Sequence, residues 1–143
     1  MSLEECFENR KLRKARPDLL KAAASIQVAK RKVAEAEELE KAGFRNMALI
    51  QAYASMFHAG RALLFRDGII EKSHYCLIIY LKEKYVKTGS IPIESITLMD
   101  SFREERNDVL YSLERITVEA KECEEGVKSA RLFIKIVERA LKE

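Results

Sequence analysis

The sequence predicts an all-α protein, an up-and-down bundle of four to six helices with no sheet. Apolar residues recur every three or four positions along most of the chain, and no stretch alternates with the period of two that strands need. Only five glycines and two prolines occur in 143 residues, and 34% of the residues are charged, which is typical of a compact helical protein. We expect a single domain over residues 1–143, with residues 1–15 as a weakly ordered N-terminal helix or arm.

The first long helix is predicted from residue 19 to residue 42. Pro17 suits the first turn of a helix, and Asp18 complements the positive end of the helix dipole. Apolar residues then step by three or four as far as Gly43, which stands where a C-terminal cap is expected.

The central helix, residues 44 to about 67, is apolar on almost every side, so it is expected to be buried in the bundle. Its apolar run is too short, and too often interrupted by charge, to span a membrane. Gln51, Ser55 and His58 step by four and three and form one polar strip on this helix. The strip finds its partners inside the bundle, in a second subunit or in a ligand.

Three further helices are predicted at residues 73–87, 93–112 and 117–141. Ser73 and Thr117 are the expected N-caps of the first and last of them. The last helix carries an unbroken apolar stripe that serves either the core or association between subunits. The middle helix has an inward stripe in which two arginines interrupt apolar residues: Ile96, Met99, Arg103, Arg106, Leu110 and Leu113.

The two arginines are the main anomaly of the sequence. An arginine on such a stripe either snorkels to solvent, pairs with a carboxylate, or faces a cleft or a subunit interface. Asp100, Glu104 and Asp108 are close enough along the helix to pair with them, so both interpretations stay open.

Several functional classes lack support in the sequence. The chain contains no glycine-rich phosphate loop, no HExxH and no GxSxG. Cys6, Cys76 and Cys123 are widely spaced and odd in number, which indicates neither a disulfide framework nor a zinc site, and we expect no metal and no cofactor. The net charge of +3 is mild and gives no evidence of DNA specificity. The N-terminus lacks the apolar core of a signal peptide, so a cytoplasmic protein without membrane association is expected.

Three stretches carry a resemblance to a known family. The central AYASMFHAGRALLFRDGI resembles the second long helix of the HEPN (higher eukaryotes and prokaryotes nucleotide-binding) domain family, in a branch with YYAMFHAARALL. The following EKSHYCLIIYLKEKYVKTGSIP is similar to the continuation of that branch. RNDVLY at 106–111 falls where the family has its arginine-initiated motif, and the resemblance covers residues 19 to 140.

The resemblance implies a bundle of four to five helices that pairs as a symmetric homodimer. Many family members are metal-independent endoribonucleases whose motif is an arginine, four to six residues and a histidine, with the two copies meeting across the dimer cleft. A guanidinium can stabilise a phosphorane-like transition state while an imidazole moves protons. Many are encoded beside a minimal nucleotidyltransferase that acts as the antitoxin.

By this resemblance Arg106 is the motif arginine and Asn107 the polar residue that follows it. Tyr111 stands in place of the motif histidine, and because an ordinary tyrosine has a pKa near ~10 it is a poor base at neutral pH. His58 could supply an imidazole from the central helix if it faces the same cleft, with Gln51 and Ser55 beside it.

Three hypotheses of function remain open at the level of sequence. The first is a homodimeric HEPN bundle that binds a nucleotide or RNA phosphates at a cleft that contains Arg103, Arg106, Asn107 and Tyr111. It would act in a toxin–antitoxin or stress-defence setting with a nucleotidyltransferase-like partner. The second adds metal-independent RNA cleavage. The third is a non-catalytic helical module that binds another protein.

Overall fold

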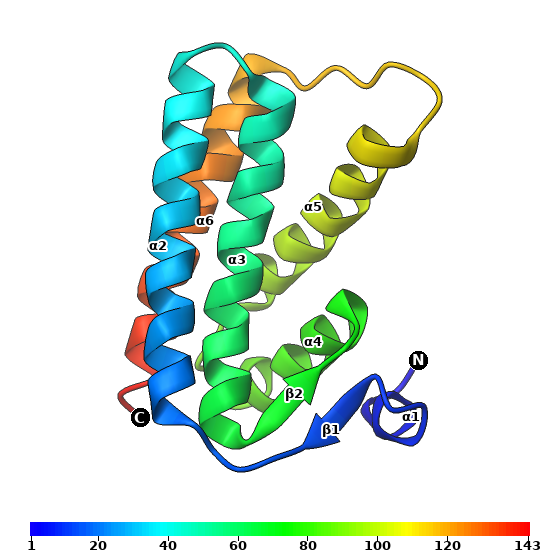
Figure 1. Cartoon of the computed structure of the whole chain (residues 1–143), viewed down its shortest axis with the longest axis vertical. Coiled ribbons are helices and arrows are strands. Elements are labelled where there is room, and N and C mark those ends of the chain that lie inside the picture. The colour runs from blue at the N-terminus through cyan, green and yellow to red at the C-terminus, as the bar shows by residue number, and fades with distance from the viewer.

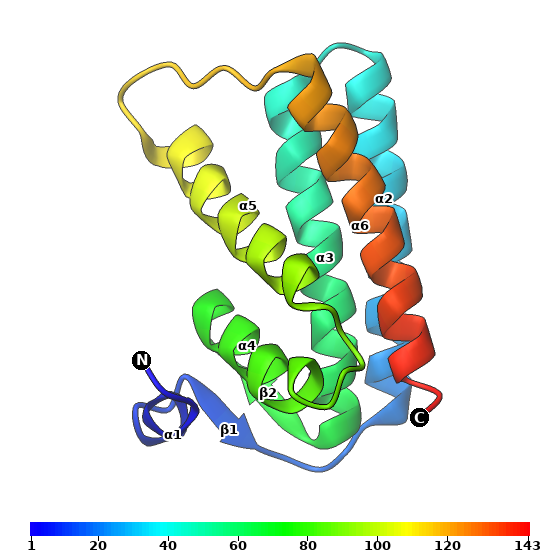
Figure 2. The same cartoon turned by 180° about the vertical axis from the view of Figure 1, so that it is seen from behind.

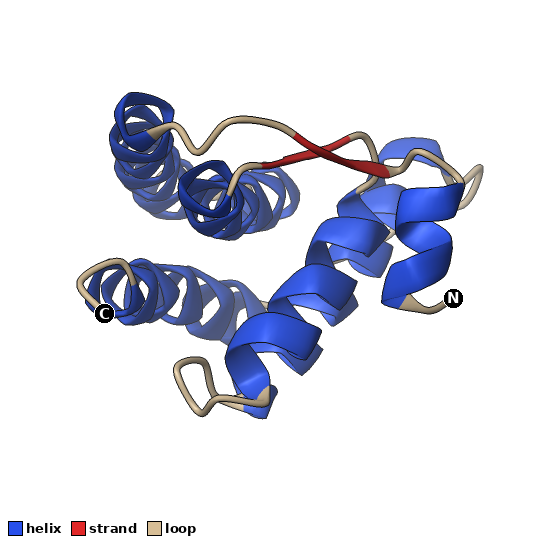
Figure 3. Ribbon diagram, turned by 90° about the horizontal axis from the view of Figure 1, so that it is seen from below, coloured by secondary structure: helices blue, strands red, loops and turns tan.

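The computed structural model describes all 143 residues and confirms the all-α bundle (Figure 1). The elements in chain order are α1 (Leu3–Glu8), β1 (Leu12–Lys14), α2 (Leu19–Lys41), α3 (Arg45–Asp67), β2 (Ile69–Glu71), α4 (His74–Leu81), the π-helical turn η1 (Lys82–Val86), α5 (Ile93–Tyr111) and α6 (Ala120–Ala140). The sequence analysis expected no sheet, and β1 and β2 correct this with one short antiparallel ribbon. Figure 3 shows this ribbon at the edge of the helical bundle.

Three long helices form the main bundle, and α3 lies at its centre. The α2–α3 hairpin turns at Gly43, which has a positive φ of 86°, and α6 packs against both helices (Figures 1 and 2). Fully buried alanines face one another along the hairpin, and they let the two helices approach closely: Ala29, Ala36, Ala48, Ala52 and Ala59. The apolar stripe of α6 is buried in this bundle from Cys123 to Val137, so the core interpretation of the stripe is confirmed.

α4 and α5 pack on α3 on the side away from α2. Ser73 caps α4, as predicted, by accepting a hydrogen bond of 3.1 Å from the backbone N–H of Cys76. The first half of α5 is anchored by Ile96, Met99 and Phe102, which are all buried.

The second half of α5 leaves the bundle, as Figure 2 shows. Leu110 is 43% exposed and Leu113 is fully exposed, so the predicted inward stripe ends after Met99. The stripe fails because a periodic apolar line requires a neighbouring helix to cover it, and none reaches this part of α5. The predicted cap at Thr117 is also wrong, since α6 begins at Ala120 after an extended connection.

The N-terminal segment is tied to α4 and β2. β1 pairs with β2, with Leu12 opposite Glu71. Cys6 and Cys76 form a disulfide between α1 and α4, which corrects the expectation of no disulfide. The sulfur of Met1 lies 3.7 Å from that of Cys6 and 3.6 Å from that of Cys76. Sequence spacing could not reveal this pair because the two cysteines are 70 positions apart.

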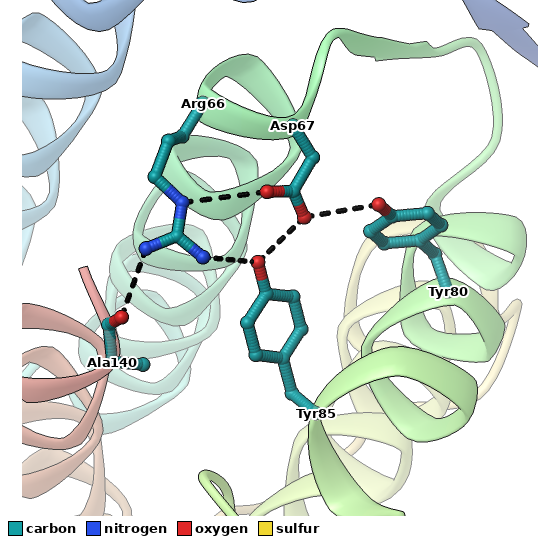
Figure 4. A network of polar contacts seen from close by, with 5 residues as sticks. All are labelled: Arg66, Asp67, Tyr80, Tyr85 and Ala140. Carbon is teal, nitrogen blue, oxygen red and sulfur yellow. Dashed lines mark hydrogen bonds and ion pairs between the residues drawn. The ribbon is translucent and has the colours of Figure 1, made fainter. Parts of the chain in front are cut away.

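A buried polar network joins the end of α3 to α4, η1 and α6 (Figure 4). The Asp67 carboxylate accepts hydrogen bonds from the hydroxyls of Tyr80, at 2.9 Å, and Tyr85, at 2.5 Å. The Arg66 guanidinium donates to the Tyr85 hydroxyl at 2.6 Å and to the carbonyl oxygen of Ala140 at 2.9 Å. Burial and the nearby Asp67 carboxylate raise the pKa of both tyrosines. Because its members satisfy one another, we interpret this network as structural.

None of the helices combines the length and the apolar character that crossing a membrane requires.

Candidate functional site

A cluster of aromatic rings lies where α3, α4 and α5 meet. The hydroxyl of Tyr53 is 2.7 Å from Nδ1 of His74, the first residue of α4. The His74 ring stacks on Phe57, with centroids 4.0 Å apart and planes inclined by 9°. Tyr53 and Phe57 are one helical turn apart on α3, so they present their rings on the same face. The His74 ring is therefore fixed by a hydrogen bond and by stacking.

Arg103 and Arg106, the two arginines predicted to be site residues, lie beside this cluster on α5, but they have different side-chain partners. The guanidinium of Arg103 lies 5.2 Å from the centre of the Tyr75 ring, and its Nε is 2.9 Å from a carboxylate oxygen of Asp100. Arg106 donates to the side-chain oxygen of Asn107 at 3.2 Å and forms no ion pair with any carboxylate of the chain. The ion-pair interpretation thus holds for Arg103, whereas Arg106 keeps an uncompensated charge.

The electrostatic surroundings of the two histidines are cationic. Burial lowers the pKa of His74, and the charges of Arg106, Arg103 and Arg61 lower it further. Burial, Arg61 and the lysine and arginine on α2 lower the pKa of His58 to about 4. Both rings are therefore neutral at pH 7. Of the two, His74 lies beside the arginines of α5, where Asp100 pairs with Arg103 and no carboxylate pairs with Arg106.

The other residues of the arginine motif lie at the solvent-exposed end of α5. Asn107 is exposed, and Tyr111 is 72% exposed and has no hydrogen-bond partner. The exposed apolar side chains of Leu110 and Leu113 are close to Tyr111 in the sequence. This end of α5 is an unpartnered apolar surface beside Arg106.

The polar strip of α3 points elsewhere. Gln51 donates to a carboxylate oxygen of Glu35 on α2 at 2.6 Å, and Ser55 donates to the carbonyl oxygen of Ala29 at 2.8 Å. His58 also borders α2, where its backbone carbonyl accepts from Ser25 at 2.6 Å. The structure therefore does not bring Gln51, Ser55 or His58 to Arg103 and Arg106, because Tyr53 and Phe57 occupy the α5-facing side of α3.

Sequence reasoning missed four members of the cluster: Tyr53, Phe57, His74 and Tyr75. His74 directly follows the Ser73 cap at the start of α4, a position that by itself favours a capping or packing role. The spacing of Tyr53 and Phe57 by four residues was a usable signal for one aromatic face. Nothing in the sequence indicated which helix would cover that face.

Fold and site together define a helical-bundle protein with a cationic and aromatic cluster, a combination suited to ligands that carry phosphate and a ring. The sequence model of the HEPN domain matches residues 22–140 of the 143. The chain belongs to the HEPN domain family, which associates it with a nucleotide- or RNA-related function. No curated protein matches the chain in sequence.

Proposed function

We propose that this protein binds a nucleotide or the phosphates of RNA at the α5 site, through Arg103 and Arg106 with Asn107 and Tyr111. The observation that carries the proposal is the uncompensated charge of Arg106 next to an aromatic cluster. A guanidinium without a carboxylate partner is free to form paired hydrogen bonds with a phosphate. Tyr75, 40% exposed beneath Arg103, offers a ring on which a base could stack.

We further propose that the chain acts as one domain in a cytoplasmic homodimer. The exposed Leu110, Tyr111 and Leu113 support a subunit contact at the end of α5, since large apolar side chains gathered beside a charged motif favour an interface. A contact there would bring the two copies of Arg106 toward a shared cleft. Membership of the family is the basis for adding a nucleotidyltransferase-like partner in a toxin–antitoxin or stress-defence setting.

The test starts with size-exclusion chromatography with light scattering. A fluorescently labelled single-stranded RNA is then titrated in EDTA with the wild type, with Arg106→Ala and with Arg139→Ala. Arg139 is an exposed arginine of α6 without a side-chain partner, so Arg139→Ala is the matched control for loss of one positive charge. We expect a dimer whose RNA affinity falls about tenfold in Arg106→Ala and less than twofold in the control.

Equal affinities in Arg106→Ala and the wild type would refute the proposed site. A monomer at micromolar concentration would refute the shared cleft. Expression of both variants in cells tests the toxin setting, because toxicity that depends on the site disappears in Arg106→Ala and persists in Arg139→Ala. Intact RNA after incubation in EDTA, with a clean nuclease control, separates binding from metal-independent cleavage.

A further inference from the structure

We propose that His74 is a ligand-binding residue of this site, and that its Nε2–H donates a hydrogen bond to a phosphate oxygen held by Arg106. The inference rests on the proposed function and adds a residue outside the arginine motif.

The position of His74 is fixed by two residues of α3. Stacking on Phe57 at 4.0 Å sets the plane of the ring, and the contact of 2.7 Å with Tyr53 sets its rotation within that plane. Nδ1 is occupied by the Tyr53 hydroxyl, so Nε2 is the free ring nitrogen. A ring fixed at two points loses little side-chain entropy when it binds a ligand.

The tautomer follows from the burial of Tyr53. This residue is 1% exposed, so water does not reach its hydroxyl, and Nδ1 of His74 is its one side-chain partner. Burial raises the pKa of Tyr53, so the hydroxyl keeps its proton at neutral pH and donates it in this hydrogen bond. Nδ1 of the neutral ring must then be the acceptor, and the ring proton is on Nε2.

The surroundings of His74 favour an anion as the acceptor for Nε2–H. Tyr75, the residue after His74, lies against α5, because the guanidinium of Arg103 is 5.2 Å from the centre of its ring. The charges that act on the His74 ring come from Arg106 and Arg103 on α5 and from Arg61 on α3. Two of these arginines form ion pairs. The Nε atom of Arg61 is 2.8 Å from a carboxylate oxygen of Glu71, and Arg103 pairs with Asp100. Arg106 remains free, so a phosphate that binds its guanidinium is the natural acceptor for a neutral donor on His74.

The first measurement is a long-range ¹H–¹⁵N NMR spectrum of the imidazoles at pH 7.5, with and without inorganic phosphate. The only other histidine is His58, whose ring is within reach of the charges of Arg31 and Lys32 on α2, and it is the internal control. We expect an unprotonated Nδ1 and a protonated Nε2 in His74, and a phosphate-dependent shift of the His74 signals that exceeds any shift of His58. A protonated Nδ1, or shifts confined to His58, would overturn the proposal.

The second measurement uses the RNA titration with His74→Gln, Tyr53→Phe and His58→Gln. We expect affinity to fall about tenfold in His74→Gln, severalfold in Tyr53→Phe, where the tautomer is no longer fixed, and not at all in His58→Gln. Thermal unfolding confirms that each variant is folded, and the NMR arm requires no variant. Binding lost in Arg106→Ala but retained in His74→Gln would overturn this inference alone. Binding that is retained in both variants would overturn the proposed function as well.

Discussion

Replacing Asp67 by alanine should destabilise the protein through the network of Figure 4. The change leaves the hydroxyls of Tyr80 and Tyr85, on residues 5% and 7% exposed, without their acceptor. Each buried donor without a partner costs about 1–3 kcal/mol. Removing a negative charge from the last turn of α3 returns about 0.5 kcal/mol through the helix dipole. The net loss of unfolding free energy should be about 3 kcal/mol.

Thermal unfolding followed by circular dichroism tests this value. For a chain of this size, a loss of about 3 kcal/mol lowers Tm by roughly 10 °C. Asp108→Ala is the matched control, because Asp108 is exposed on α5 and its carboxylate has no partner; its Tm should not fall. Tyr80→Phe, which removes one donor and leaves the rest of the network, should cost about 1 kcal/mol. A Tm of Asp67→Ala within 2 °C of the wild type would refute the structural interpretation of the network.

Three other predictions concern stability. Burial and, after it, a hydrogen bond with Glu122 raise the pKa of Glu105 to about 7, so protonation favours the folded state. The unfolding free energy should fall by about 1 kcal/mol, after solvent screening, between pH 5.5 and 8 in urea titrations. Glu122→Gln should weaken this pH dependence without abolishing it, because the burial of Glu105 remains. Cys6→Ser should lose up to about 4 kcal/mol relative to the oxidised wild type, and dithiothreitol should lower the Tm of the wild type but not of this variant. Gly68→Ala should lower the unfolding free energy by more than 2 kcal/mol in urea titrations, because φ is 78° and the new Cβ would lie 2.6 Å from a backbone oxygen. Gly89→Ala is the control: φ is 85° but no atom is near the new Cβ, so the loss should be about 1 kcal/mol.

The features predicted correctly are those encoded by neighbouring residues. The hairpin at Gly43 and the start of α4 at Ser73 follow from caps and periodicity within a few positions. The central position of α3 follows from its apolar character on all sides. These signals need no knowledge of what a helix packs against.

The features that were missed depend on segments distant in the sequence. β1 and β2 are three residues each, too short for an alternating pattern to be recognised. The departure of α5 from the bundle left Leu110 and Leu113 exposed although their spacing suits a core. In the candidate site, Arg103 and Arg106 stood out as charges on an apolar stripe. The contact between Tyr53 and His74 joins residues 21 positions apart and has no local signature.

Because α5 leaves the bundle, its two halves are under different structural constraints. Ile96, Met99 and Phe102 anchor its first half in the core, whereas Arg106 and Tyr111 lie in the second half, which contributes little to the core. Sequence change in the second half should therefore alter the proposed binding site with little loss of folding stability. If the proposed site is correct, ligand specificity can change during evolution through substitutions in this half of α5 while the core of the bundle is conserved.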